Sequence, residues 1–310
     1  MDTLPQRDHF RLMHRLRVRW AEVDLQRIVF NPHYLTYIDT AFGEYWRAMG
    51  VAYEDIPALL DGDMYVKKAT VEYHGSARLD ELIDVGLRCE RIGNSSIRIG
   101  GAIFRGETLL ITAELIYVFA DPATQTSRPV PPVLRGLFED FESRADIVEV
   151  RTGGWDELGE DARALRQAVY VQEMGLPAAL AEDMADLQAR HVVLRNRLGQ
   201  VLATGRLVSE TPDRMRVGRL AVRHNLRTNG LGARAVQALL DEARCRGSAE
   251  VVLGARQSAQ SFYQRLGFRP VGEVFTEAGV PHVEMVLGMC EPAPLLARGR
   301  PADQMSSRNG

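Results

Sequence analysis

Two stretches of the chain hold residues whose types and spacing could do chemistry on an activated acyl group. In the first stretch, Asp24 is a lone carboxylate in a segment that precedes a predicted helix. Such a carboxylate can attack a thioester carbonyl carbon, or it can activate water for that attack. A helix that begins at Pro32 would turn free N–H groups and the positive end of its dipole toward the developing oxyanion. Proline has no N–H, so nearby residues would supply these donors.

The second stretch runs Arg227, Thr228, Asn229, Gly230, Leu231, Gly232 and Ala233, and it follows a strand-like segment that ends in Leu220, Ala221 and Val222. Backbone N–H groups at a helix start bind anions such as a pyrophosphate, and glycine permits close approach. The exposed backbone of the preceding strand could hold an extended substrate arm as an added strand. Further on, Tyr263 offers a phenol that could protonate a departing thiolate. Alternatively, Tyr263 packs in the core with its hydroxyl satisfied.

The elements that must position the first stretch predict an α+β half. Residues 16–20 alternate like a half-buried strand, and residues 32–50 show an apolar stripe at helical spacing, with Asn31 as cap and Gly50 as stop. The stripe consists of Leu35, Ile38, Phe42, Tyr45, Trp46 and Met49. Strands are predicted at 65–73, 83–92, 96–104 and 109–119, followed by a Pro-rich break and a short helix over 133–144. One long helix and consecutive strands indicate an antiparallel sheet packed on that helix.

The second half alternates helices and strands, which predicts an α/β domain. Helices are expected at 155–172, 230–246 and 258–266, and strands at 191–196, 201–208, 214–222 and 249–253, with two final strands before Met289. We place the domain boundary within 144–148. The tail 291–310 is rich in Pro, Ala, Arg and Ser, and we expect it to be disordered.

The first half resembles the 4-hydroxybenzoyl-CoA thioesterase-like family of hotdog proteins over residues 10–144. The resemblance lies in segments 18–24, 28–35, 39–46, 71–73 and 130–132 and in their order. It implies that Asp24 is catalytic and that the protein forms a homodimer or homotetramer, since hotdog proteins pair with sites at the subunit interface. Many members carry a histidine at the position of Asn31, whose role here is either a helix cap or a substrate contact. His33 and Glu44 are weaker candidates, each equally a solvated residue of the helix.

The second half resembles GNAT N-acetyltransferases over residues 147–289. The match rests on the Arg227 to Ala233 signature, on the helix motif 259–268 and on segment 279–285. It implies that residues 220–222 and 227–233 bind acetyl-CoA and that Tyr263 is the general acid. Glu173, Asp183 and Asp186 could form an acidic pocket for an amine, although solvated helix charges are the favoured interpretation.

Several other classes of protein are excluded or disfavoured. A formal net charge of -3 argues against a surface for nucleic acid or anionic lipid, and no apolar stretch is long enough to span a bilayer. No histidine pair or C-x-x-C predicts a metal, and the three scattered cysteines fit a reducing cytoplasm. The G-x-G-x-x-A pattern from Gly230 to Ala235 lacks the tight turn and the later acidic residue of a dinucleotide site. No serine-hydrolase elbow is present.

These observations predict a cytoplasmic, bifunctional acyl-CoA enzyme without a tightly bound cofactor. The first domain would hydrolyse an acyl-CoA thioester, and the second would transfer an acetyl group from acetyl-CoA to an unidentified amine. Alternatively, only one domain is catalytic, with the hotdog domain as a dimerisation scaffold or the GNAT domain as a CoA-binding module. A third possibility gives the GNAT fold a longer acyl donor.

Overall fold

The computed structural model describes residues 4–277 and 279–289. The chain divides into two compact units. The first runs to Glu149 and includes Leu194–Leu202 and Arg223–Asn229, and the second comprises Val150–Val193, Ala203–Val222 and the chain from Gly230 onward. The tail 291–310, predicted to be disordered, lies outside the described residues.

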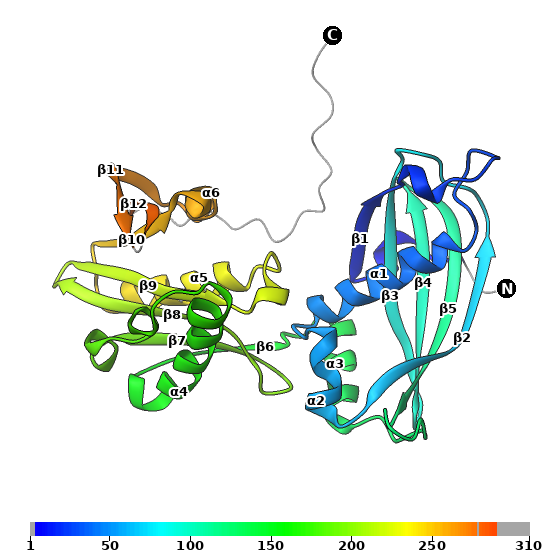
Figure 1. Ribbon diagram of the computed structural model, residues 1–310, viewed down its shortest axis with the longest axis horizontal. Coiled ribbons are helices and arrows are strands. Elements are labelled where there is room, and N and C mark those ends of the chain that lie inside the picture. Colours follow the sequence, from blue (N-terminus) through cyan, green and yellow to red (C-terminus); the bar gives the residue numbers. More distant parts are fainter. Residues whose placement is uncertain (1–3, 278, 290–310) are drawn as a thin grey trace, which may run out of the picture. The chain divides into compact units, whose positions relative to one another are not determined.

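The first unit is an antiparallel sheet packed on one long helix, α1 (His33–Ala48) (Figure 1). The strands lie in the order β1-β3-β4-β5-β2. Their bounds are β1 Leu12–Arg17, β2 Asp63–Tyr73, β3 Leu82–Ile92, β4 Ser96–Arg105 and β5 Thr108–Ala120, and two shorter helices are α2 Ile56–Leu60 and α3 Pro132–Glu142. From α1, Ile38, Tyr45 and Trp46 are fully buried, and Phe42 stacks on Tyr117 of β5 with ring centroids 4.2 Å apart. The predicted hotdog fold is confirmed.

Two local expectations for the first unit are wrong. The strand predicted over 16–20 lies earlier, at Leu12–Arg17, because Trp20–Glu22 turns into a 3-10 helix when the Glu22 carboxylate accepts a hydrogen bond from the Arg19 N–H. Leu35, counted in the buried stripe, is 37% exposed.

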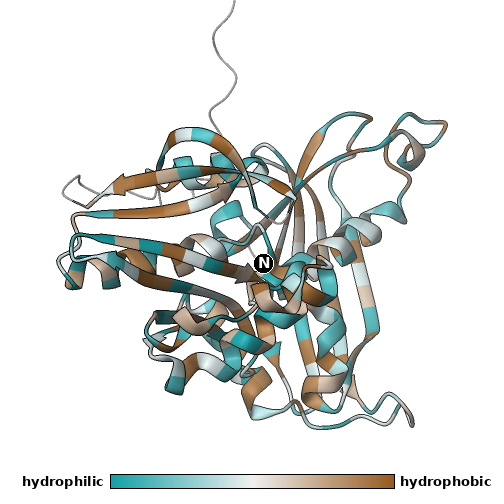
Figure 2. Ribbon diagram, turned by 60° about the vertical axis from the view of Figure 1, so that its left-hand side comes forward, coloured by the Kyte–Doolittle hydropathy of each residue, from teal (hydrophilic) through white to brown (hydrophobic). Residues whose placement is uncertain are grey.

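The second unit is built on a mixed sheet in the order β11-β12-β10-β9-β8-β7-β6. The strands are β6 Val148–Gly153, β7 Arg190–Asn196, β8 Val201–Thr211, β9 Arg214–Val222, β10 Glu250–Arg256, β11 Arg269–Glu277 and β12 Val280–Gly288, and the helices are α4 Trp155–Arg166, α5 Leu231–Cys245 and α6 Gln260–Arg265. The sequence pattern did not predict β6. Apolar and polar residues mix along the strands of both sheets (Figure 2), as in sheets with one covered face.

The helix predicted over 155–172 is not α-helical throughout. It is α-helical as α4 and then widens into a π-helix over Gln167–Glu173. Such wide turns are rare and are frequent at functional sites. Short 3-10 helices lie at Arg7–His9, Trp20–Glu22, Tyr53–Asp55, Ala178–Leu180, Met184–Leu187, His224–Leu226 and Gln257–Ala259.

The proposed domain boundary can be tested by cutting the chain between Ala145 and Asp146. This cut leaves the five-stranded sheet whole and precedes β6, so each fragment keeps all the described strands of its own sheet. Two segments of the first unit, Leu194–Leu202 and Arg223–Asn229, stay with the second fragment. We expect two soluble fragments with cooperative thermal unfolding and a native near-ultraviolet circular dichroism spectrum. Insoluble or molten fragments would show that the two halves are not separate folding units.

Candidate functional sites

Asp24 lies at the tip of a short hairpin that precedes α1. Val23 and Val29 form an isolated antiparallel bridge, and the Asp24 N–H donates to the Ile28 carbonyl oxygen at 3.0 Å. One carboxylate oxygen of Asp24 accepts the Gln26 N–H at 2.7 Å, while the other has no hydrogen-bond partner among the described residues. The half-buried carboxylate is thus oriented, with one oxygen left for a substrate or a water molecule.

Glu22, which the sequence reasoning missed, fixes this hairpin to the helix. Its side chain is buried, and its carboxylate accepts hydrogen bonds from the Tyr37 hydroxyl at 2.6 Å and the Arg19 N–H at 2.7 Å. Its own carbonyl oxygen accepts the Phe30 N–H at 2.9 Å, which closes the hairpin. Burial alone would raise the pKa of Glu22, but these hydrogen bonds and the Arg19 charge bring it below its ordinary value. The only sequence signal is an acidic residue three positions after Arg19, the spacing of a capping box.

The start of α1 differs from the prediction. Asn31 does not cap the helix, because Pro32 occupies the N-cap position and no side chain bonds the first turn. The first amide N–H groups donate instead to carbonyl oxygens three residues back: His33 to Phe30 at 2.9 Å, Tyr34 to Asn31 at 3.3 Å and Leu35 to Pro32 at 3.1 Å. The amides expected to be free for an oxyanion are therefore engaged within the chain.

The weaker candidates in this region have different surroundings. The Asn31 side chain is exposed and has no hydrogen-bond partner among the described residues. His33 is half-buried and packs edge-on against Phe30 with ring centroids 6.1 Å apart. Glu44 pairs with Arg47 on the helix surface at 2.5 Å. This contact favours the interpretation of Glu44 as a surface residue of the helix over that of a site residue.

Glu22→Gln should destabilise the first unit by about 1–3 kcal/mol, because the amide would place donors against the Arg19 N–H groups. The matched control, Glu44→Gln, removes a surface ion pair and should cost less than about 1 kcal/mol. Urea unfolding measures both values. Because the pKa of Glu22 is depressed in the folded state, its contribution should be complete above about pH 4.3 and decline as the pH falls further. Equal stability of the two variants at pH 7 would contradict this role.

In the second unit, the C-terminal half of β9 separates from β10. The two strands pair in parallel only through Arg214–Arg216 and Glu250–Val252. Beyond that point, β9 pairs with β8 over residues 217–222, whereas β10 pairs with β12, as far as the described strands show. Figure 1 shows β10, β11 and β12 as a group set apart from β6–β9. Over residues 217–221, the edge of β9 that faces away from β8 has no neighbouring strand among the described residues, so an extended ligand can pair with it there.

A β-bulge interrupts this open edge. Thr204 lies opposite Ala221 and Arg206 opposite Gly218, so that Arg219 and Leu220 together face Gly205. Arg219 has a φ of 52°, in the left-handed region. The bulge turns backbone groups out of the regular ladder, and such groups are suited to bind a carbonyl oxygen that gains negative charge.

The turn after β9 leads into α5 with the backbone that the signature requires. Thr228 and Gly230 have φ values of 72° and 77°, and the first intrahelical bond runs from the Arg234 N–H to the Gly230 carbonyl oxygen. The N–H groups of the first turn therefore have no helical partner and can bind an anion. A Cβ on Gly232 would lie 3.5 Å from both Val222 and Phe262, which shows that the end of β9, the start of α5 and α6 meet here.

Tyr263 lies on α6 next to the residue that contacts Gly232. Its ring packs edge-on against Phe262 and Phe268, with centroids 4.9 and 5.9 Å apart. No described residue hydrogen-bonds its hydroxyl, unlike the alternative in which that hydroxyl is satisfied in the core. Burial raises the pKa of Tyr263, so it carries its proton at neutral pH, as a general acid must.

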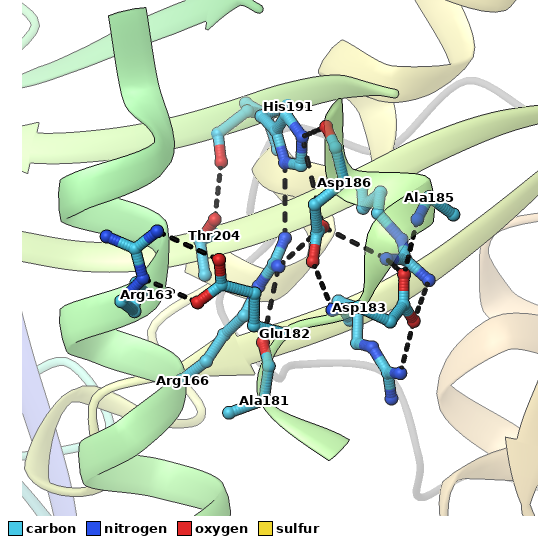
Figure 3. Close-up of polar contacts among 12 residues, drawn as sticks. Arg163, Arg166, Ala181, Glu182, Asp183, Ala185, Asp186, His191 and Thr204 are labelled. Atoms are coloured by element: carbon cyan, nitrogen blue, oxygen red, sulfur yellow. Dashed lines mark hydrogen bonds and ion pairs between the residues drawn. The ribbon is translucent and has the colours of Figure 1, made fainter. Parts of the chain in front are cut away.

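The acidic residues considered for an amine pocket are arranged differently from either interpretation (Figure 3). Asp186 is 1% exposed and pairs with Arg166 at 2.9 Å, and Asp183 pairs with Arg206 at 2.6 Å. Asp186 is buried and Asp183 is about one-third exposed, and both carboxylates are paired with arginines, so neither is free to bind a cation. Glu173 is exposed at the end of the π-helix, and its contact with a substrate stays a prediction.

The described residues hold no group of three or more His, Cys, Asp or Glu side chains that could bind a metal ion. Within the same part of the chain, no helix combines the length and apolar character needed to cross a membrane. Cys89 and Cys245 form no disulfide, and burial raises the pKa of the Cys89 thiol to about 12.

The folds and sites define a two-domain protein with a hotdog unit and an acetyltransferase-like unit. The thioesterase superfamily model matches residues 26–112, just after Asp24, and the acetyltransferase (GNAT) domain model matches residues 159–289. The second match is supported by a UPF0039 protein of Schizosaccharomyces pombe, 35% identical over 130 residues that make up 41% of this chain and 85% of that protein.

Two further relatives cover one unit each. An uncharacterized N-acetyltransferase of Bacillus subtilis is 28% identical over 132 residues, 42% of this chain and 93% of its own. The solved 1,4-dihydroxy-2-naphthoyl-CoA thioesterase of Synechocystis is 15% identical with a TM-score of 0.39, covering 42% of this chain and 96% of that one. The second unit belongs to the family of these acetyltransferase relatives, and the first unit matches the thioesterase superfamily model over residues 26–112.

Proposed function

We propose that the chain is a bifunctional acyl-CoA enzyme, a thioesterase in its first unit and an N-acetyltransferase in its second. The observation that carries the proposal is the open, bulged edge of β9, followed after the 3-10 helix His224–Leu226 by a glycine turn and by N–H groups of α5 that have no helical partner. An extended pantetheine arm followed by a pyrophosphate matches that sequence of backbone groups.

For acetyl transfer, the geometry supports a direct attack by the amine on the thioester. The bulge of β9 would bind the carbonyl oxygen as negative charge develops on it. The amine nitrogen forms the new bond to the acyl carbon, the carbon–sulfur bond breaks, and Tyr263 donates its proton to the departing thiolate. The proton released by the amine passes to solvent, and Tyr263 regains a proton from solvent after the thiol leaves. With Asp183 and Asp186 paired to arginines, the amine must be recognised by other groups, of which Glu173 is one candidate.

For thioester hydrolysis, the support comes from Asp24. Its unengaged carboxylate oxygen is available either to attack the thioester carbonyl or to take a proton from an attacking water molecule. The same segment exposes Trp20, Leu25 and Phe30, large apolar side chains suited to cover an acyl group.

The alternative, in which only one domain is catalytic, is supported by one feature of the first unit. Strand β2 is an edge strand of 11 residues whose exposed side chains include Tyr65, Val66 and Tyr73. Long exposed edges of this kind pair with another chain. We infer that the protein is a homodimer or homotetramer through the hotdog unit, whether or not that unit is a thioesterase.

Asp24→Ala should lower acyl-CoA hydrolysis by about a hundredfold or more and leave the fold and oligomer intact, because it removes the group that attacks or activates water. Hydrolysis is measured by thiol release across a panel of acyl-CoA esters. Glu107→Ala, which removes an exposed carboxylate from the turn between β4 and β5, is the matched control and should behave as the parent. Hydrolysis by Asp24→Ala within a few-fold of the parent rate would contradict the catalytic role of Asp24.

Gly230→Glu should abolish acetyl-CoA binding in calorimetry, because it adds charge and bulk where the pyrophosphate is expected. Gly247→Glu is the matched control, since Gly247 also has a positive φ, of 72°, but lies beyond the other end of α5. Both variants carry the same strain and the same charge, so only the position differs. Unchanged affinity in Gly230→Glu would exclude the turn as the binding site.

Tyr263→Phe should bind acetyl-CoA with parental affinity and slow transfer by about tenfold to a hundredfold, because the thiolate loses its proton donor. Mass spectrometry of cell extract incubated with the protein and acetyl-CoA measures acetylated amines. Parental rates in this variant would remove Tyr263 from the mechanism.

A further inference from the structure

A largely buried ion-pair network connects the loop before β7 to the bulge of β9. Figure 3 shows the part of it that contains Arg166, Asp183 and Asp186. Arg166 is fully buried on α4 and binds Asp186, and Asp186 also pairs with Arg206 of β8 at 3.0 Å. Asp183 bridges Arg206 and Arg219, with oxygen–nitrogen distances of 2.6 Å to each. The Asp183 N–H donates to Asp186 at 3.0 Å, which joins the two carboxylates through one short loop. The network therefore ends on Arg219, a residue of the bulge itself.

The backbone of Arg219 is held where an arginine alone would not stay. A non-glycine residue in the left-handed region is strained, whereas glycine would adopt a φ of 52° freely. The arginine side chain is mostly buried and ends in the ion pair with Asp183. The fold thus keeps a strained arginine here in place of an unstrained glycine. This favours a role for the ion pair between its side chain and Asp183.

A second anchor fixes the other residue of the bulge. The Tyr170 hydroxyl, from the π-helix, donates to the Leu220 carbonyl oxygen at 2.9 Å. Burial raises the pKa of Tyr170, although four arginines lower it in part, so this donor keeps its proton. Leu220 is thereby held from the π-helix and Arg219 from the loop before β7.

We propose that the Asp183–Arg219 pair is a positioning device that sets the bulge of β9 so that its backbone faces the carbonyl oxygen of the bound thioester. This inference rests on the proposed acetyltransferase function. Neither side chain reacts; Arg206, Asp186 and Arg166 support the pair from behind. The bulge geometry, and with it the polarisation of the thioester, depends on an ion pair outside the reacting groups.

The net charge of the network makes it possible to distinguish a positioning role of the Asp183–Arg219 pair from a purely electrostatic role. Three arginines face two carboxylates, so the network carries a net positive charge. The hydrogen bond from Arg206 lowers the pKa of Asp183 well below its ordinary range, against the effect of burial, so the carboxylate is ionised at neutral pH. Asp183→Asn would make this region more positive. Charge alone would then keep or improve both the binding of acetyl-CoA and the stabilisation of its oxyanion, whereas loss of positioning would reduce the polarisation of the thioester.

The test uses the full chain with acetyl-CoA carrying carbon-13 at the thioester carbonyl, observed by infrared difference spectroscopy. In the parent, the bound carbonyl should absorb at a lower frequency than in free acetyl-CoA, because the bulge polarises it. In Asp183→Asn the frequency should return most of the way to the free value, with the calorimetric Kd within about a factor of five of the parent. The asparagine can still accept the Ala185 N–H that Asp183 caps, so the loop should keep its shape.

The matched control is Glu182→Gln, because Glu182 is the neighbouring residue but pairs with Arg163 of α4 at 2.5 Å. It should leave the carbonyl frequency unchanged. Arg219→Gln breaks the same pair from the β9 side and should reproduce the effect of Asp183→Asn, and Arg219→Lys should restore part of the shift.

Each result has a separate meaning. A parent protein that does not bind acetyl-CoA would overturn the proposed acetyltransferase function. A parent that binds and shifts the carbonyl, with Asp183→Asn and Arg219→Gln shifting it equally, would overturn the positioning role and leave that function standing. If both variants lost their near-ultraviolet circular dichroism, the pair would be a purely structural element and the positioning role would also be overturned.

Discussion

The separation of β9 from β10 is the constraint on which the proposed acetyl-CoA site of the second unit depends. A strand that is paired on both sides along its full length has no backbone groups left for a ligand, and here the pairing of β9 with β10 stops after Arg216. The unpaired edge would be costly unless a ligand or solvent satisfied its backbone groups. The bulge, the glycine turn and Tyr263 are all placed relative to this opening.

In both units, acidic residues that do not react hold a backbone segment in place. Glu22 holds the hairpin that carries Asp24 through hydrogen bonds to Tyr37 and Arg19. In the acetyltransferase unit, Asp183 and Asp186 hold strand and loop through arginines. Removing a buried carboxylate from such a set leaves its donors unpaired, so each group keeps a backbone segment in one conformation.

The sequence predicted both folds and most elements because the apolar periodicity of α1, the strand composition and the turn residues are local signals. It placed Tyr263 and the Arg227 to Ala233 turn on the correct elements. It misjudged Asn31, because a helix cap is decided by the backbone angles of Pro32, and those angles are not visible in composition. It also misread Asp183 and Asp186, since their partners Arg206 and Arg219 lie on strands far along the chain. Long-range ion pairs of this kind leave no pattern in one sequence.

The most direct test of the central claim is hydrogen–deuterium exchange of the full chain with and without acetyl-CoA, resolved by mass spectrometry. The account predicts slower exchange of the amides of residues 217–222 and of the first turn of α5, because the pantetheine arm and the pyrophosphate would bind those N–H groups. Unchanged exchange in both segments, at an acetyl-CoA concentration that saturates the protein, would contradict it.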